Sequence, residues 1–281
     1  MSALYRERLY LVFSDLDGSL LDHYSYSHTA ALPALERLEQ EKIPLILCSS
    51  KTRAEILGLK QQLQNVHPFI VENGAAVFIP QHYFSSQPPQ TRGQDGFWVY
   101  DLSESRAYWL GLLNQLQEDF SGEFESFHGM GTVGIMAATG LSTQQAEQAN
   151  AREYSEPVRW LGSDERKQGF IDRLKALGAN VLQGGRFLSV SGEHDKGSAL
   201  CWLRSVYQSA SPAAVMHDLA IGDSGNDRAM LDAAETALLI RSPVHEFPTL
   251  ARKSSGVLRS DAPGPRGWAE GVTAWLNQTE S

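Results

Sequence analysis

The sequence has few cysteines, a deficit of basic side chains and no long apolar run. Its two cysteines, Cys48 and Cys201, lie far apart among 281 residues, which argues against a disulfide-stapled secreted domain and predicts a reduced, cytoplasmic protein. Lys and Arg number 24 against 33 Asp and Glu, a net charge of −9, so the composition gives no basic footprint for nucleic acid. No segment approaches the ~18 uninterrupted apolar residues of a membrane span, so a membrane is not an expected partner.

Short apolar runs alternate with helical patterns in the first third of the chain. Hydrophobic residues make up 42% of the sequence, enough to fill a sizeable core. The runs at 9–13, 43–48 and 69–71 are continuous, as is typical of strands buried on both faces. Between them, 29–42 and 51–64 carry apolar residues at helical spacing. This alternation predicts parallel strands with helical crossovers, a doubly wound, Rossmann-like α/β core.

The middle of the chain has a different texture. A turn-rich stretch at 82–93 is interpreted as a linker, and the residues after it are richer in Gln, Gly and aromatic side chains. The α/β pattern resumes after Asp195. We therefore expect a Rossmann-like core made of 1–85 and 191–281, interrupted by a smaller inserted α+β domain at 86–190.

Two glycine-rich segments carry further expectations. Gly129 to Gly134 fits the spacing of a dinucleotide-binding fingerprint, but no convincing parallel βαβ unit surrounds it. It is therefore expected to be a loop of the inserted domain, between helices at 105–117 and 142–154. The tail from Ser260 is rich in Gly and Pro and is expected to precede a final helix over 268–276.

Polar motifs follow the three predicted strands at 9–13, 43–48 and 69–71 and a fourth, short predicted strand at 219–221. Ligands of open parallel sheets bind beyond the carboxyl ends of the strands, so these motifs are expected to share one site. Each motif by itself is also typical of a turn or a helix N-cap. Only the occurrence of all four at successive strand ends favours a ligand-binding site. The four are Asp15-Leu16-Asp17-Gly18-Ser19, Ser49-Ser50-Lys51, Glu72-Asn73-Gly74 and Gly222-Asp223-Ser224-Gly225-Asn226-Asp227.

The carboxylates of these motifs predict a metal ion. Two carboxylates ~5 Å apart repel by roughly 3 kcal/mol at an effective dielectric constant of ~20, so bringing Asp15, Asp17 and Asp223 together is costly without a cation. Oxygen ligands without His or Cys favour Mg²⁺. Mg²⁺ dehydrates reluctantly and usually sits between carboxylates and phosphoryl oxygens, so the motifs also predict a phosphate-bearing partner.

The motifs resemble those of the haloacid dehalogenase superfamily of phosphotransferases. Asp15 to Ser19 resembles the first motif, Ser49 the second, Lys196 in His194-Asp195-Lys196-Gly197 the third, and Gly222 to Asp227 the fourth. The large insertion resembles the type II cap of the sugar phosphatase branch. The resemblance implies hydrolysis of a phosphate monoester with the help of a bound Mg²⁺ ion. It assigns catalysis to Asp15, Asp17, Ser49 and Lys196, and the metal to Asp15, Asp17, Asp223 and Asp227.

Other segments are similar to the mannosyl-3-phosphoglycerate phosphatases. The similar segments are Ser49-Ser50-Lys51-Thr52-Arg53-Ala54-Glu55, Glu72-Asn73-Gly74-Ala75, Arg152-Glu153-Tyr154-Ser155-Glu156-Pro157, Gly184-Gly185-Arg186-Phe187 and Pro263-Gly264-Pro265-Arg266-Gly267-Trp268. The chain departs from that pattern at Leu188-Ser189, where an aromatic residue and a histidine are expected, and this leaves the sugar open. The resulting candidates for binding a phosphosugar substrate are Ser50, Lys51, Asn73, Gly184, Gly185, Arg186 and Asn226.

Arg186 is the candidate for holding a glycerate carboxylate, because a planar guanidinium pairs with a carboxylate through two hydrogen bonds. The alternative is an exposed arginine on a strand of the inserted domain. For the whole chain, the alternatives are a phosphatase for glucosyl-3-phosphoglycerate or another sugar phosphate, a phosphomutase, and a phosphosugar-binding regulator without turnover. The oligomeric state stays open.

Overall fold

The computed structural model describes residues 8–184, 186–252 and 255–279. The contacts between these residues divide the chain into two compact units. Unit 1 comprises the described residues of Met1–Ser49, Asn65–Tyr100 and Asp195–Ser281, and unit 2 comprises Ser50–Gln64 and Asp101–His194. None of the described helices is long and apolar enough to cross a membrane.

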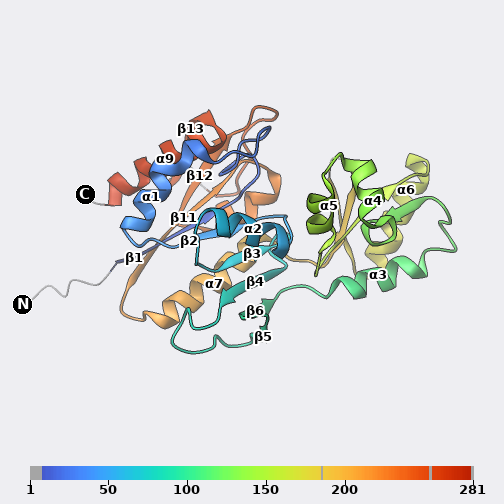
Figure 1. The fold of residues 1–281 in the computed structure, drawn as a ribbon, viewed down its shortest axis with the longest axis horizontal. Helices are drawn as coiled ribbons and strands as arrows, with labels where there is room; N and C mark the ends of the chain where they lie inside the picture. Colours follow the sequence, from blue (N-terminus) through green and yellow to red (C-terminus); the bar gives the residue numbers. More distant parts are fainter. Residues whose placement is uncertain (1–7, 185, 253–254, 280–281) are drawn as a thin grey trace, which may run out of the picture. The chain divides into compact units, whose positions relative to one another are not determined.

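Unit 1 is built on a nine-stranded sheet, which confirms the predicted α/β class (Figure 1). Its strand order is β13-β12-β11-β1-β2-β3-β4-β6-β5, and the strands from β13 to β3 run parallel. Residues 11–14 of β1 are fully buried, as the continuous apolar run predicted. The strands are β1 (Arg8–Ser14), β2 (Leu45–Cys48), β3 (Phe69–Val71), β4 (Ala76–Pro80), β5 (Arg92–Gln94), β6 (Phe97–Asp101), β11 (Val215–Gly222), β12 (Thr236–Arg241) and β13 (Val257–Pro263).

Helices cover both faces of this sheet. Figure 1 shows α1 and α9 side by side on one face and α7 on the other. The apolar side chains of α9 pack on the sheet: a Cβ at Gly271 would lie 2.3 Å from the Leu238 side chain of β12. The helices of unit 1 are α1 (Leu32–Gln40), α7 (Lys196–Ala210), α8 (Arg228–Ala233) and α9 (Gly264–Thr279), with single 3₁₀ turns at Thr29–Ala31 and Gly225–Asp227.

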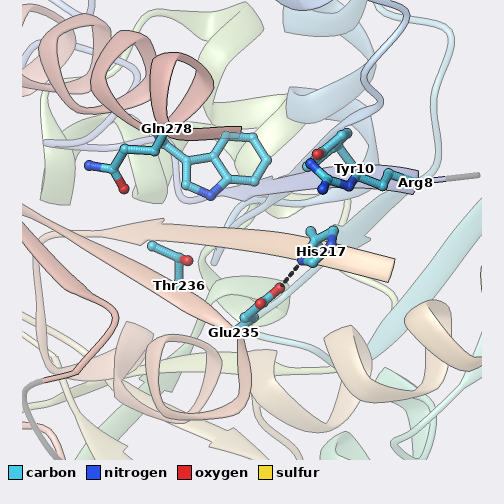
Figure 2. Close-up of a pocket in the computed structure, with 7 residues that line it drawn as sticks. Arg8, Tyr10, His217, Glu235, Thr236 and Gln278 are labelled. Atoms are coloured by element: carbon cyan, nitrogen blue, oxygen red, sulfur yellow. Dashed lines mark hydrogen bonds and ion pairs between the residues drawn. The ribbon is translucent and has the colours of Figure 1, made fainter. Parts of the chain in front are cut away.

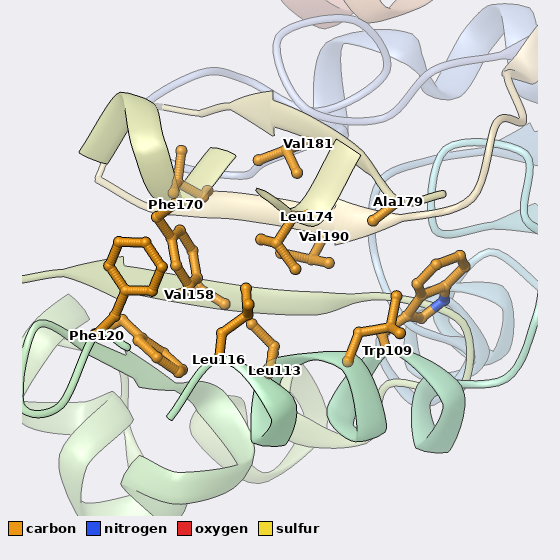
Figure 3. Close-up of a cluster of buried hydrophobic side chains, with 13 residues drawn as sticks. Trp109, Leu113, Leu116, Phe120, Val158, Phe170, Leu174, Ala179, Val181 and Val190 are labelled. Carbon is orange, nitrogen blue, oxygen red and sulfur yellow. The ribbon is translucent and has the colours of Figure 1, made fainter. Parts of the chain in front are cut away.

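Unit 2 has a four-stranded antiparallel sheet in the order β7-β8-β10-β9. Its main core lies between this sheet and helices α3 and α6, where Trp109, Phe120 and Phe170 pack with aliphatic side chains (Figure 3). The strands are β7 (Phe124–Ser126), β8 (Glu156–Trp160), β9 (Asn180–Gln183) and β10 (Leu188–Ser191); the helices are α2 (Arg53–Gln62), α3 (Arg106–Gln115), α4 (Phe127–Thr139), α5 (Thr143–Asn150) and α6 (Asp164–Ala176).

The boundaries of the two units differ from the insertion expected at 86–190. The segment expected to be a linker leads instead into the antiparallel pair β5 and β6, which extends the edge of the nine-stranded sheet. Residues 50–64 fall in unit 2, because α2 packs against α5.

Two local expectations were wrong. Gly129 to Gly134 is not a loop: it lies within α4, which is kinked at Gly131, a residue with φ of 58°. The final helix begins at Gly264 rather than near 268, because β13 carries the chain to Pro263 and Pro265 is tolerated in the first turn of a helix. In both places the glycines and prolines mark a kink and a helix start, not irregular chain.

Candidate active site

The four polar motifs end neighbouring parallel strands of unit 1. The strands β11, β1, β2 and β3 are adjacent in the sheet, and they end at Gly222, Ser14, Cys48 and Val71. The backbone amide of Asp15 also donates to the carbonyl of Ile221, 2.9 Å away, which ties the first motif to the fourth. The motifs therefore meet at the carboxyl edge of the sheet, where ligands of such folds bind.

Lys196 lies at the centre of this edge, at the start of α7. Its Nζ donates to Asp15 Oδ1 at 2.5 Å and to Asp227 Oδ1 at 2.7 Å, and no part of Lys196 is exposed to solvent. Asp195 caps α7 by accepting from the amide of Ser198. The Asp195-Lys196 segment thus supplies both the N-cap of α7 and an ammonium that bridges Asp15 of the first motif and Asp227 of the fourth.

Two glycines allow the loops to approach this closely. Gly18 has φ of 82°, and a Cβ there would lie 2.6 Å from Asp223 Oδ2. Gly74 has φ of 98°, and a Cβ there would lie 2.1 Å from the carbonyl oxygen of Asp195. Side chains at these positions would push the first motif away from the fourth and the Glu72-Asn73-Gly74 turn away from α7.

Three buried carboxylates gather around Lys196. Asp15, Asp223 and Asp227 each offer an oxygen within 4.8 Å of the others, and they form the one such group with metal-binding spacing among the described residues. Asp227 is held by the backbone: its Oδ2 accepts from the amides of Asp223 and Ser224 at 3.1 and 3.0 Å. Asp223 also has His245 nearby, with Nε2 3.4 Å from its Oδ2. The side chain of Asp17 is not part of this group.

The group carries more negative charge than Lys196 offsets. Burial, with Asp227 as the next largest influence, raises the pKa of Asp15 from 3.8 to about 8 in spite of Lys196. Burial and Asp227 raise the pKa of Asp223 to about 6. A divalent cation would relieve this repulsion, and an all-oxygen donor set fits Mg²⁺. The residues present therefore fit the metal that the sequence predicted.

Mg²⁺ is expected to raise the melting temperature of chelator-treated protein more at pH 8 than at pH 5. The folded-state pKa values of Asp15 and Asp223 lie above the ordinary value of 3.8, so the stability linked to them falls as the pH rises toward about 8. Bound Mg²⁺ counters this loss where the carboxylates are ionised. Thermal unfolding with and without Mg²⁺ at both pH values measures the difference. A shift as large at pH 5 as at pH 8, or an undiminished shift in Asp223→Asn, would contradict it.

The remaining core candidates surround this group. Ser49 is fully buried; its amide donates to Ile70 O at 3.1 Å and its carbonyl accepts from the amide of Asn73 at 2.9 Å. Asn226 Nδ2 donates to Asn73 Oδ1 at 3.0 Å, so the fourth motif contacts the turn after β3. The structure therefore brings Ser49, Asn73 and Asn226 together, although their contact with a substrate stays a prediction.

The other substrate-binding candidates belong to unit 2. Arg186 is exposed and donates through Nη1 to the carbonyl of Ala138, 2.9 Å away. The amide of Gly184 donates to the carbonyl of Phe187 at 2.9 Å, and Gly185 lies outside the described residues. Ser50 and Lys51 precede α2. Their role as substrate ligands stays a prediction.

Sequence reasoning missed a hydrogen-bonded support behind Asp15. Trp268 Nε1 donates to Ser14 Oγ at 2.9 Å, and Ser14 Oγ donates to the carbonyl of Asp15 at 2.7 Å. Trp268 is fully buried in α9. It lies in one of the segments that carry the family resemblance, but nothing local in the sequence pairs it with a residue 254 positions away. His245 beside Asp223 gave no signal either.

A separate hollow of about 290 Å³ lies at the opposite end of the parallel strands (Figure 2). Arg8 and Tyr10 come from the start of β1, and His217 from the first half of β11. Tyr10 stacks on His217, whose Nδ1 is 2.8 Å from Glu235 Oε2. Because this is the amino end of the sheet, the hollow is not the candidate active site.

Comparisons with known proteins agree with this geometry. The haloacid dehalogenase-like hydrolase family matches residues 12–90. The chain is 33% identical over 264 residues to a glucosyl-3-phosphoglycerate/mannosyl-3-phosphoglycerate phosphatase of Methanococcoides burtonii, covering 94% of this chain and 96% of that protein.

Two solved structures share the fold. A sugar phosphatase of haloacid dehalogenase subclass IIB is similar with a TM-score of 0.62 and 14% identity, covering 95% of this chain and 98% of that one. The sucrose-phosphatase of Synechocystis, solved with sucrose and phosphate, is similar with a TM-score of 0.58 and 14% identity, covering 96% and 98%.

A doubly wound sheet with buried carboxylates around a buried lysine at its carboxyl edge is the arrangement of an α/β protein with a ligand site at that edge. The chain belongs to the haloacid dehalogenase-like hydrolases, and it is a phosphoric monoester hydrolase. The resemblance to the sugar phosphatase branch that the motifs predicted is confirmed.

Proposed function

We propose that this protein is a Mg²⁺-dependent phosphatase that converts mannosyl-3-phosphoglycerate to mannosylglycerate and phosphate. The observation that carries the substrate is the match along 94% of the chain to a relative named for the mannosyl and glucosyl esters. Because that name includes both sugars, glucosyl-3-phosphoglycerate is the second candidate substrate. The two free thiols, Cys48 and Cys201, fit a reduced cytoplasmic compartment.

Asp15 is proposed as the nucleophile. One carboxylate oxygen forms a bond to phosphorus while the bond from phosphorus to the ester oxygen breaks, and Asp17 gives its proton to that leaving oxygen. Asp17 then takes a proton from water, which attacks phosphorus and breaks the bond to Asp15, releasing phosphate. The enzyme returns to its starting state, so atoms and protons balance over the cycle.

The neighbouring residues supply charge and position. Lys196, at 2.5 Å from Asp15, favours the ionised nucleophile and offers an ammonium to the phosphoryl oxygens. Mg²⁺, held by Asp15, the backbone carbonyl of Asp17 and Asp223 with Asp227 in support, would neutralise charge on the phosphoryl group. Ser49 and Asn226 are proposed to hold the remaining phosphoryl oxygens.

Unit 2 is proposed to select the substrate. It contains Arg186, whose guanidinium has the geometry to grip the glycerate carboxylate, and Gly184, whose small size lets the backbone approach a sugar. Ser50, Lys51 and Asn73 are proposed to contact the substrate from beside the second motif and the turn after β3. This proposal assigns the chemistry to unit 1 and most of the substrate recognition to residues of unit 2, with Asn73 of unit 1 in addition.

A phosphate-release screen with Mg²⁺ tests the proposal. Mannosyl-3-phosphoglycerate is expected to give the highest kcat/KM, ahead of hexose phosphates and sucrose phosphate, with water as the only acceptor. A higher kcat/KM for a hexose phosphate would reject the glycosyl phosphoglycerate. Transfer to a second sugar hydroxyl in place of phosphate release would indicate a mutase, and binding without turnover would indicate a regulator.

The role of Arg186 gives the screen its control variant. Arg186→Ala is expected to raise KM about 10-fold or more for an ester with a glycerate carboxylate, the cost of losing a charge-assisted pair. An aryl phosphate, which lacks that carboxylate, should be hydrolysed as before. An unchanged KM for the carboxylate-bearing ester would remove Arg186 from the binding site.

A further inference from the structure

Helix α2 follows the second motif directly, and its first turn makes polar contacts with the 148–153 segment of unit 2. Thr52 Oγ1 donates to the carbonyl of Gln148 at 2.8 Å, at the end of α5. Arg53 Nε pairs with Glu153 Oε1 at 2.6 Å. The helix lies between β2 and β3 in the sequence. Its first turn is nevertheless hydrogen-bonded to a segment about 100 residues away in the chain.

The Arg53–Glu153 pair is partly buried, and the backbone of each partner is held in place. The two side chains are 20% and 25% exposed, so their attraction is screened less by solvent than that of a surface pair. The backbone of Glu153 is fixed, because its carbonyl accepts from the amide of Arg106 at 2.6 Å. Arg53 begins α2, whose N-terminus is fixed by a reciprocal capping box between Thr52 and Glu55.

The segment between β2 and α2 is thus held at both ends. On one side, Ser49 is bonded through its amide and its carbonyl to the strand and turn at β3. On the other side, the carbonyl of Ser50 accepts from Arg152 Nη1 at 3.4 Å, next to the Arg53–Glu153 pair. Ser49, which carries the second-motif hydroxyl, is thus followed directly by a segment that the contacts of Arg152 and of the first turn of α2 hold in place.

We propose that Arg53 and Glu153 are positioning residues of the phosphatase: their ion pair sets where the second-motif segment Ser49–Lys51 meets the phosphoryl group. This rests on the proposed role of Ser49 in holding that group, but not on which ester is the natural substrate. Because the phosphoryl group is common to every substrate, the pair affects all phosphate esters alike. A specificity residue would affect only the natural ester.

The test compares Arg53→Ala, Glu153→Gln and the double variant on p-nitrophenyl phosphate and on mannosyl-3-phosphoglycerate. A displacement of the phosphate-binding segment by about 1 Å costs about 10- to 100-fold, so kcat should fall by that factor on both esters, with KM changing less. The double variant should lose no more than the worse single variant, because the two residues act as one pair. Circular dichroism corrects each rate for the folded fraction.

The Arg166–Glu123 pair supplies the matched control. It joins Arg166, in the first turn of α6, to Glu123, just before β7, at 3.0 Å, and both side chains are more exposed than those of the Arg53–Glu153 pair. Arg166→Ala should leave kcat within about 2-fold. The proposal is overturned if Arg53→Ala and Glu153→Gln both keep wild-type kcat on the aryl phosphate, if their losses multiply, or if the loss is confined to mannosyl-3-phosphoglycerate. If that ester is not turned over at all, the proposed substrate fails while the aryl phosphate assay still decides the pair.

Discussion

Replacing Asp15 by Asn is expected to reduce Mg²⁺-dependent phosphate release by about 10⁴-fold or more, the scale seen when a catalytic nucleophile is removed. The amide has nearly the same shape but cannot form the acyl phosphate. The loss should be in kcat for the aryl phosphate and the sugar ester alike, because both pass through the same bond to phosphorus. Steady-state release of inorganic phosphate measures it.

The fold should survive this substitution. Lys196 keeps its second contact, to Asp227 at 2.7 Å, and the carbonyl of residue 15 still accepts from Ser14 Oγ. A melting temperature close to the wild-type value therefore separates lost chemistry from lost structure. Retention of more than about 1% of the wild-type kcat would indicate a nucleophile other than Asp15, because removing the nucleophile should reduce kcat by much more than about 100-fold.

The carboxyl-edge site could be predicted because its signals are local. The buried runs that became β1, β2 and β3 are continuous and end abruptly at polar residues, and parallel strands bring such ends to one edge. The adjacency of Asp15 and Asp223 follows from the sheet order alone. The distances around Lys196 do not, because they depend on how α7 packs.

Contacts between residues far apart in the chain could not be predicted from the sequence. The helical pattern at 51–64 predicted α2, but nothing in it showed that α2 packs with α5, since that contact depends on the tertiary arrangement of both helices. Trp268 behind Ser14 is a similar case. The β5–β6 hairpin was hidden by two prolines just before it, which favoured a linker over an edge strand.

Glycine was the other source of error. In α4 the residues from Gly129 to Gly134 have low helix propensity, yet the segment is helical on either side of the kink at Gly131. Its flanking side chains Phe127 and Ile135 are buried in a small cluster with α5. Tertiary burial of these side chains outweighs the local preference, which a single sequence does not reveal.

The second large effect is expected for Lys196→Met, which should destabilise the protein by about 3–5 kcal/mol at pH 8 in the absence of metal. The change leaves Asp15 and Asp227 buried without their shared cation. With the ammonium gone, the pKa of Asp15 should rise further above about 8, so the loss of stability grows as the pH rises and shrinks toward pH 5, where Asp15 is protonated. Denaturant unfolding of wild type and variant at pH 5 and pH 8 measures the difference, and phosphate release should be lost as well.

Lys60→Met is the matched control, because Lys60 is the other buried lysine of the described residues. Burial lowers its pKa to about 7, so at pH 6 the folded protein bears the cost of an ionised buried ammonium that the unfolded chain does not. Removing Lys60 should therefore reduce the free energy of unfolding far less than removing Lys196.

Mg²⁺ should also restore part of the stability of Lys196→Met at pH 8, since it can supply the missing positive charge. A Lys196→Met protein as stable as the wild type at pH 8 without metal would show that Lys196 does not offset the negative charge of this group, and the charge argument for the metal site would fail with it.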